Sequence, residues 1–144
     1  MNSETNNSSG RSSPATDRSE MNHGKLTHKI IGCAMQVHSV LRNGFQEVIY
    51  QRALGIEFRH HNITYVREND KRIFYKDMAI GTRRVDFFVE NKIVVEIKAI
   101  AALDNVQIAQ ALNYLEAFNV EVGLLLNFGA KSLEVKRLLN KKFK

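Results

Sequence analysis

The chain has 144 residues, 44% of them hydrophobic and 25% charged, a composition ordinary for one globular domain with a hydrophobic core. No apolar run approaches the roughly 20 residues that cross a bilayer, and the single cysteine, Cys33, excludes an internal disulfide and a cysteine-based zinc cluster. The formal net charge of +6 favours polyanionic partners, and no membrane partner is expected.

Residues 1–24 are polar, rich in Ser, Asn and Thr, and lack helical or strand periodicity. We predict a disordered tail here, because so few hydrophobic residues cannot offset the entropy of ordering. The segment has no signal-peptide core, so a cytoplasmic location is expected. The domain then spans residues 25–144 and carries 19 basic and 12 acidic residues, a net charge of +7. This excess is typical of nucleic-acid binding or, alternatively, of a basic, well-solvated surface.

The domain begins with apolar residues at helical spacing, at positions 30, 34, 37 and 41. They predict a helix that starts near Leu26, with Thr27 as its N-cap, and that ends at Arg42-Asn43-Gly44. Within this helix we expect Cys33 to be a small buried side chain and His38 a surface or flanking one. Neither has a partner at a spacing that implies chemistry.

A second helix is predicted from Gln46 to His60, where positions 47, 50, 54 and 58 form one stripe. Three of these are core-type residues, and the first is Glu47. A carboxylate on the inward face of a helix is costly unless it has a partner or a metal ion. Alternatively, Glu47 lies near the helix N-terminus, where the helix dipole favours an anion. The pattern alone leaves both interpretations open.

Two short β-prone runs follow, Ile63–Val66 and Lys71–Tyr75, and then a turn at Lys76–Ala79. Residues Arg84–Ala101 have a clearer pattern, because they alternate with period two on both sides of Glu90-Asn91-Lys92. This pattern predicts an antiparallel hairpin with a three-residue loop.

In that hairpin Val89 would lie opposite Ile93, and Asp86 opposite Glu96. One face is wholly apolar and consists of Val85, Phe87, Val89, Ile93, Val95 and Ile97. The other face carries Asp86, Glu96 and Lys98, so two carboxylates and an amine would converge on one side of the sheet.

The rest of the chain predicts a helix over Asp104–Phe118, a buried strand over Val120–Phe128, and a terminal helix that Ser132 caps. The last helix would be strongly basic, either as a solvated tail or as a contact for phosphates. Because a helix links the last two strands, these strands should be parallel neighbours. The expected fold is α/β, a mixed sheet flanked by helices on both faces.

The paired carboxylates are the chemical centre of the sequence. Opposed across two strands, they would repel, which raises a pKa or calls for a cation. Oxygen ligands without His or Cys suit Mg²⁺ or Mn²⁺, and Lys98 on the same face could orient an attacking water. A surface salt bridge between Lys98 and either carboxylate is the simpler alternative.

These residues carry a family resemblance. Asp86 followed by Glu96-Ile97-Lys98 resembles the signature of the PD-(D/E)XK nuclease superfamily, whose core has the order αβββαβ. Gln110-Ala-Leu-Asn-Tyr114 is similar to the Gln-x-x-x-Tyr motif of its RecB-like branch. Gly44-Phe-Gln-Glu47-Val-Ile-Tyr50 matches the GxxExxY motif that names a small bacterial family, and residues 122–129 resemble its final strand.

The resemblance covers about residues 26–140 and implies a metal-dependent nuclease that hydrolyses phosphodiester bonds in DNA. It implies that Asp86, Glu96, Glu47 and the Ile97 carbonyl oxygen hold Mg²⁺ or Mn²⁺, and that Lys98 is the catalytic lysine. Gln110 and Tyr114 would line the site and contact the substrate or Lys98. The alternatives are a binding module for nucleic acid or protein without turnover, and an accessory subunit that acts with a protein partner or as a homo-oligomer.

Overall fold

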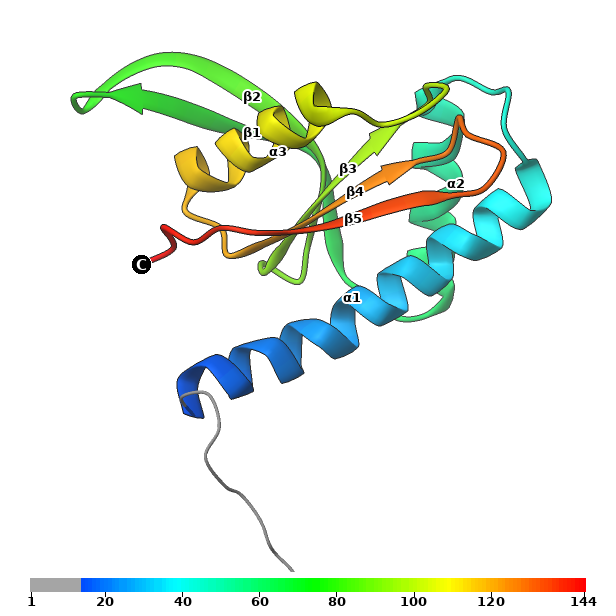
Figure 1. The fold of residues 1–144 in the computed structure, drawn as a ribbon, viewed down its shortest axis with the longest axis horizontal. Coiled ribbons are helices and arrows are strands. Elements are labelled where there is room, and N and C mark those ends of the chain that lie inside the picture. The colour runs from blue at the N-terminus through cyan, green and yellow to red at the C-terminus, as the bar shows by residue number, and fades with distance from the viewer. Residues whose placement is uncertain (1–13) are drawn as a thin grey trace, which may run out of the picture.

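The structure, a computed structural model, describes residues 14–144, with side chains from His23 onward. This part of the chain forms three helices and five strands (Figure 1). They are α1 (Pro14–Leu41), α2 (Glu47–His60), β1 (Tyr65–Tyr75), β2 (Met78–Val89), β3 (Ile93–Lys98), α3 (Asn105–Phe118), β4 (Val122–Asn127) and β5 (Glu134–Leu139). Within this range no helix combines the length and apolar character that crossing a membrane requires.

The five strands form one mixed sheet in the order β1-β2-β3-β4-β5. All neighbouring strands are antiparallel except β3 and β4, which are parallel and are joined by α3. The α1 and α2 helices pack on one face of the sheet and α3 packs on the other (Figure 1). The predicted α/β fold with a mixed, helix-flanked sheet is therefore confirmed.

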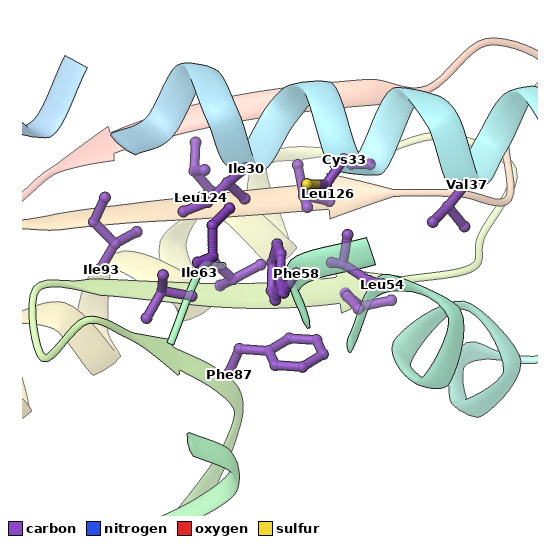
Figure 2. Close-up of a cluster of buried hydrophobic side chains, with 14 of the residues drawn as sticks. Ile30, Cys33, Val37, Leu54, Phe58, Ile63, Phe87, Ile93, Leu124 and Leu126 are labelled. Carbon is purple, nitrogen blue, oxygen red and sulfur yellow. The ribbon is translucent and has the colours of Figure 1, made fainter. Parts of the chain in front are cut away.

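The larger core lies between the sheet and the helices α1 and α2 (Figure 2). Tyr50, Leu54 and Phe58 are fully buried, so the predicted stripe is the core face of α2. Cys33 is buried as expected. His38 is also buried, which corrects its predicted surface position: its Nε2 lies 3.1 Å from the Ala130 carbonyl oxygen, so the ring keeps a polar partner inside the protein.

A smaller core lies under α3 and contains Val94, Leu115 and Leu125. It also contains Val85, which strict alternation places on the same face as Phe87. Strand β2 therefore changes the face it presents between these two residues. The change is possible because the β2–β3 ladder ends at the Phe87–Val95 pair, so β2 is no longer held beside β3 beyond it.

The two predicted short runs before the hairpin are one strand, β1, which pairs with β2 along almost its whole length. The turn that connects β1 to β2 is shorter than predicted and consists of Lys76 and Asp77, with φ values of 49° and 65°. Two residues with positive φ match the twist of the flanking strands, which explains the long hairpin.

The terminal helix was predicted wrongly, because Glu134–Leu139 forms β5, antiparallel to β4. Every residue of β4 is buried, so its outer backbone groups need a partner, and β5 supplies it. This pairing is a long-range contact that overrides the helical pattern of the segment.

The first helix ends at Leu41 as predicted, and Arg42 and Gly44 both have positive φ. It starts at Pro14 instead of near Leu26, so part of the segment assigned to the polar tail is helical. Residues 1–13, where the rest of the predicted disordered tail falls, lie outside the described residues.

Candidate active site

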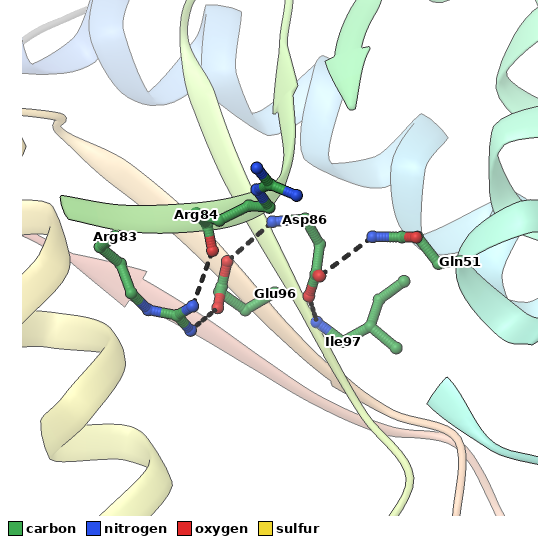
Figure 3. Close-up of polar contacts among 6 residues, drawn as sticks. All are labelled: Gln51, Arg83, Arg84, Asp86, Glu96 and Ile97. Atoms are coloured by element: carbon green, nitrogen blue, oxygen red, sulfur yellow. Dashed lines mark hydrogen bonds and ion pairs between the residues drawn. The ribbon is translucent and has the colours of Figure 1, made fainter. Parts of the chain in front are cut away.

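Strands β2 and β3 separate where the two predicted carboxylates lie. The Val89–Ile93 pairing confirms the predicted register, and both Glu90 and Asn91 in the loop have positive φ. Beyond Phe87–Val95, the last residue pair of the β2–β3 ladder, side-chain carboxylates accept the hydrogen bonds of the backbone N–H groups (Figure 3). The Asp86 N–H donates to Glu96 Oε2 at 3.1 Å, and the Ile97 N–H donates to Asp86 Oδ2 at 2.7 Å. We call the place where β2 and β3 separate, at Asp86 and Glu96, the fork. The carboxylates of these two residues bridge the two strands there.

Asp86 faces helix α2. Its Oδ1 accepts a hydrogen bond of 3.1 Å from Gln51 Nε2, a buried amide one turn after Glu47 (Figure 3). Beside this contact is a hollow of about 200 Å³, lined by Glu47, Val48, Gln51, Glu68, Asp86 and Ile97. Glu47, the first residue of α2, lies exposed at its rim, so the helix brings this carboxylate to the hollow while its other stripe residues enter the core.

Glu96 faces the other way, toward Arg83 and helix α3. Its carboxylate is only 6% exposed, and its Oε1 accepts a hydrogen bond of 2.8 Å from Arg83 Nη2. Arg83 Nη1 donates to the Arg84 carbonyl oxygen at 2.7 Å. The Arg83 guanidinium also lies over the Tyr114 ring, 4.3 Å from its centroid. Arg83 thus joins Glu96 to α3.

Burial controls the ionisation of all three carboxylates. Burial raises the pKa of Asp86, and the hydrogen bond from the Ile97 N–H opposes that rise. Burial and then the Asp86 charge raise the pKa of Glu96 to about 7. Burial likewise raises the pKa of Glu47, against the attraction of Lys98. Negative charge is costly at each position, and a nearby cation would relieve that cost.

The other predicted residues lie around this fork. Lys98 is the last residue of β3, and its charge lowers the pKa of Glu47, Asp86 and Glu96 in opposition to burial. Tyr114 joins the site through Arg83. Gln110, one turn earlier on α3, is exposed to solvent, and its contact with a substrate stays a prediction.

Gln51 and Arg83 are two site residues that sequence reasoning missed. Gln51 had a detectable signal, because it lies four residues after Glu47 and so on the same helix face. Arg83 had none, since strict alternation along β2 would not direct both Arg83 and Asp86 to one fork.

The oxygen atoms around the fork are ligands suited to a divalent cation. Among the described side chains, those from His23 onward, no three carboxylate, imidazole or thiolate groups lie close enough to hold an ion by themselves. Two carboxylates and a backbone carbonyl suffice for Mg²⁺, which usually keeps several waters and also binds substrate phosphate. Each carboxylate oxygen accepts one hydrogen bond here and retains a free lone pair, so the residues fit such an ion.

Comparison with known proteins gives one family and one fold. The family model described as PD-(D/E)XK nuclease superfamily matches residues 24–138. A solved structure described as the crystal structure of SSO0001 matches with a TM-score of 0.50 and 19% identity, over 63% of this chain. The match spans 48% of that protein, about half its length, and shows a shared fold. No curated protein matches the chain.

Proposed function

Because the chain belongs to the PD-(D/E)XK nuclease superfamily, we propose that it is a metal-dependent nuclease that hydrolyses phosphodiester bonds in DNA. The observation that carries this proposal is the fork of β2 and β3, where the half-buried Asp86, the buried Glu96 and the exposed Glu47 lie around Lys98. The GxxExxY motif of residues 44–50 further supports membership of the smaller family of that name.

In this proposal Asp86, Glu96 and the Ile97 carbonyl oxygen hold Mg²⁺ or Mn²⁺, and Glu47 binds the ion or its waters from the rim of the hollow. The ion, when bound, supplies Lewis-acid stabilisation of charge on the phosphate. Gln51 and the Ile97 N–H fix the orientation of the Asp86 carboxylate through their hydrogen bonds.

Lys98 is the proposed catalytic lysine. As the last residue of β3 it lies half-buried beside the carboxylates, where its ammonium can orient the attacking water and offset charge that develops on the phosphate. Tyr114 and Gln110 form the α3 wall of the site, and the net charge of +7 over residues 25–144 favours a polyanionic substrate.

The test is a cleavage panel with Mn²⁺ on single-stranded, duplex, flapped and RNA substrates. We expect the wild type to cleave DNA, and Asp86→Asn or Lys98→Ala to lower the rate by about a hundredfold or more. Lys92→Ala, an exposed lysine in the β2–β3 loop, is the matched control and should cleave as the wild type does. Equal residual cleavage in all four proteins would refute the proposal.

A second candidate is a nucleic-acid or protein binding module without turnover. It is favoured by one observation: all four oxygens of Asp86 and Glu96 already accept hydrogen bonds from protein donors. Calorimetric titration with Mn²⁺ separates the two candidates, because only the nuclease needs the ion. Size-exclusion chromatography of the protein from its host would reveal a homo-oligomer or an activating partner.

A further inference from the structure

The distal part of the β1–β2 hairpin extends beyond the rest of the sheet (Figure 1). We call residues 72–82 the arm. Its two strands are paired with each other up to Tyr75 and Met78, whereas β3 pairs with β2 only at residues 87–89. Every residue from Phe74 to Thr82 is exposed. The arm is thus a regular two-stranded ribbon without a core of its own, an arrangement that is marginal in water unless something covers it.

The tip of the arm is apolar. Phe74, Tyr75, Met78 and Ile80 are 57%, 61%, 68% and 65% exposed. Four large hydrophobic side chains gathered on one exposed ribbon mark an interaction site, unlike single hydrophobic residues scattered over a surface.

The flanks of the arm are basic. The Arg72 guanidinium lies 5.9 Å from the centre of the Phe74 ring, and the Lys76 ammonium lies 5.5 Å from that of Tyr75. Between residues 66 and 84 there are six basic and three acidic residues, and one of the three acids is Asp77 in the turn. One of the acids, Asp70, is already paired with Arg84 at 2.8 Å. The partner of the arm should therefore combine negative charge with apolar or aromatic surface.

We propose that the arm enters the groove of a DNA duplex beside the carboxylate fork. This inference rests on the proposed nuclease function and specifies duplex DNA as its substrate. The major groove of B-form DNA, about 12 Å wide, admits a two-stranded β-ribbon. Arg72 and Lys76 would contact the phosphates, and the apolar tip would contact base edges and sugars.

The connection between arm and fork sets the length of duplex required. Strand β2 carries both Met78 at the tip and Asp86 at the fork, eight residues apart. At about 3.3 Å per residue this is a reach of about 26 Å, which corresponds to about 8 base pairs of duplex. A substrate should thus need about that length of duplex on one side of the scissile phosphate.

The charge of the arm argues against a second copy of the chain as its occupant, since two arms would bring like charges together. The groove geometry argues against an RNA duplex, whose major groove is deep and narrow. The experiment below would still detect either a second copy of the chain or an RNA duplex as the partner of the arm.

The test measures binding by fluorescence anisotropy without divalent metal, so that binding is separate from cleavage. We expect Tyr75→Ser with Met78→Ser to weaken binding to a duplex of about 24 base pairs by about tenfold. Binding to a duplex of about 6 base pairs should not change. The matched control is Met35→Ser with Val40→Ser on α1, two side chains that are 59% and 67% exposed, and it should bind as the wild type does.

A second variant tests the charges. Arg72→Gln with Lys76→Gln should lower the slope of log affinity against log salt by about 2, one for each phosphate that no longer has a basic partner. The proposal is overturned by unchanged affinity in the arm variants, by an equal decrease in the α1 control, by an equal decrease on RNA duplex or single strands, or by a dimer that the arm variants abolish.

Failure of this proposal and failure of the nuclease proposal can be told apart. If the wild type cleaves DNA but the arm variants bind as it does, only the arm proposal fails. If the arm variants lose duplex binding in a protein that cleaves no substrate in the panel, only the nuclease proposal fails.

Discussion

At the scale of single residues, Arg83 determines the environment of Glu96. It forms the 2.8 Å ion pair with that carboxylate, stacks on Tyr114, and keeps a buried Nε that has no hydrogen-bond partner among the described residues. In this arrangement Glu96 is directed away from the hollow that Glu47 and Asp86 line. A cation that uses both Asp86 and Glu96 must therefore compete with the guanidinium for the second carboxylate.

The variant Arg83→Gln tests this competition. We expect it to bind Mn²⁺ about tenfold more tightly than the wild type by calorimetry, because Glu96 loses its internal counter-ion. Arg84→Gln is the matched control: it removes the same charge one residue away, from an exposed pair with Asp70, and should change the affinity little. Equal gains in both variants, or weaker binding in Arg83→Gln, would contradict a competing role for Arg83.

At the scale of elements, the end of β4 supports the loop that follows β3 and Lys98. Asn127 Oδ1 accepts from the N–H groups of Ile100 and Gly129, both at 3.0 Å. Its amide donates to the Ile100 carbonyl oxygen at 3.0 Å and to Glu134 Oε1 at 2.9 Å. All four hydrogen bonds of this buried side chain are made, so it ties the site loop to β4 and β5.

Gly129 lets these two segments approach each other. A Cβ at this position would overlap the backbone of Ala99 and Ile100. Gly129→Ala should therefore lower the free energy of unfolding by about 1–3 kcal/mol in urea denaturation. The control is Gly32→Ala on α1, where a Cβ meets open space and the change should stabilise the helix by about 0.5–1 kcal/mol. A Gly129→Ala protein as stable as the wild type would contradict this close approach, because the backbone of Ala99 and Ile100 would then move aside at no cost in stability.

At the scale of the whole molecule, the fork places ionisable groups inside the fold and couples global stability to pH. The pKa of Glu96 is raised in the folded protein to about 7 from an ordinary value of 4.5. A carboxyl with a raised folded pKa stabilises the fold when it is protonated, so its contribution is complete below about 4.5 and is lost as the pH rises through about 7. Asp86 and Glu47 act in the same direction, since burial raises the pKa of both.

We therefore expect the metal-free protein to lose stability between pH 5 and pH 8, by about 3 kcal/mol at most from Glu96. Urea denaturation at a series of pH values measures this loss. Glu96→Gln should flatten the profile, because the amide does not titrate, whereas Glu116→Gln on the exposed face of α3 should not. Stability that rises over this window in the wild type, or an unchanged profile in Glu96→Gln, would contradict the assignment.

Local periodicity in the sequence was sufficient for the architecture of the central hairpin and for much of the site. The alternation on both sides of Glu90-Asn91-Lys92 determined the strand register, because a shift of one residue would expose an entire apolar face. The stripe of α2 placed Glu47 at the start of that helix, next to the core residues that hold it. These features follow from spacings of two and of three to four residues, which a sequence displays directly.

The tertiary structure alone decided the features that depend on distant contacts. Strand β5 forms because the buried β4 needs a backbone partner, which its own helical pattern does not reveal. Arg83 reaches Glu96 because β2 leaves β3 at the fork, where periodicity fails. Periodicity describes neighbours along one element, whereas pairing of strand edges and separation of strands are set by backbone hydrogen bonds and packing between segments far apart in the chain. For this reason the sequence located the carboxylates and the lysine, and only the fold decided that an arginine lies against one carboxylate and a hollow beside the other.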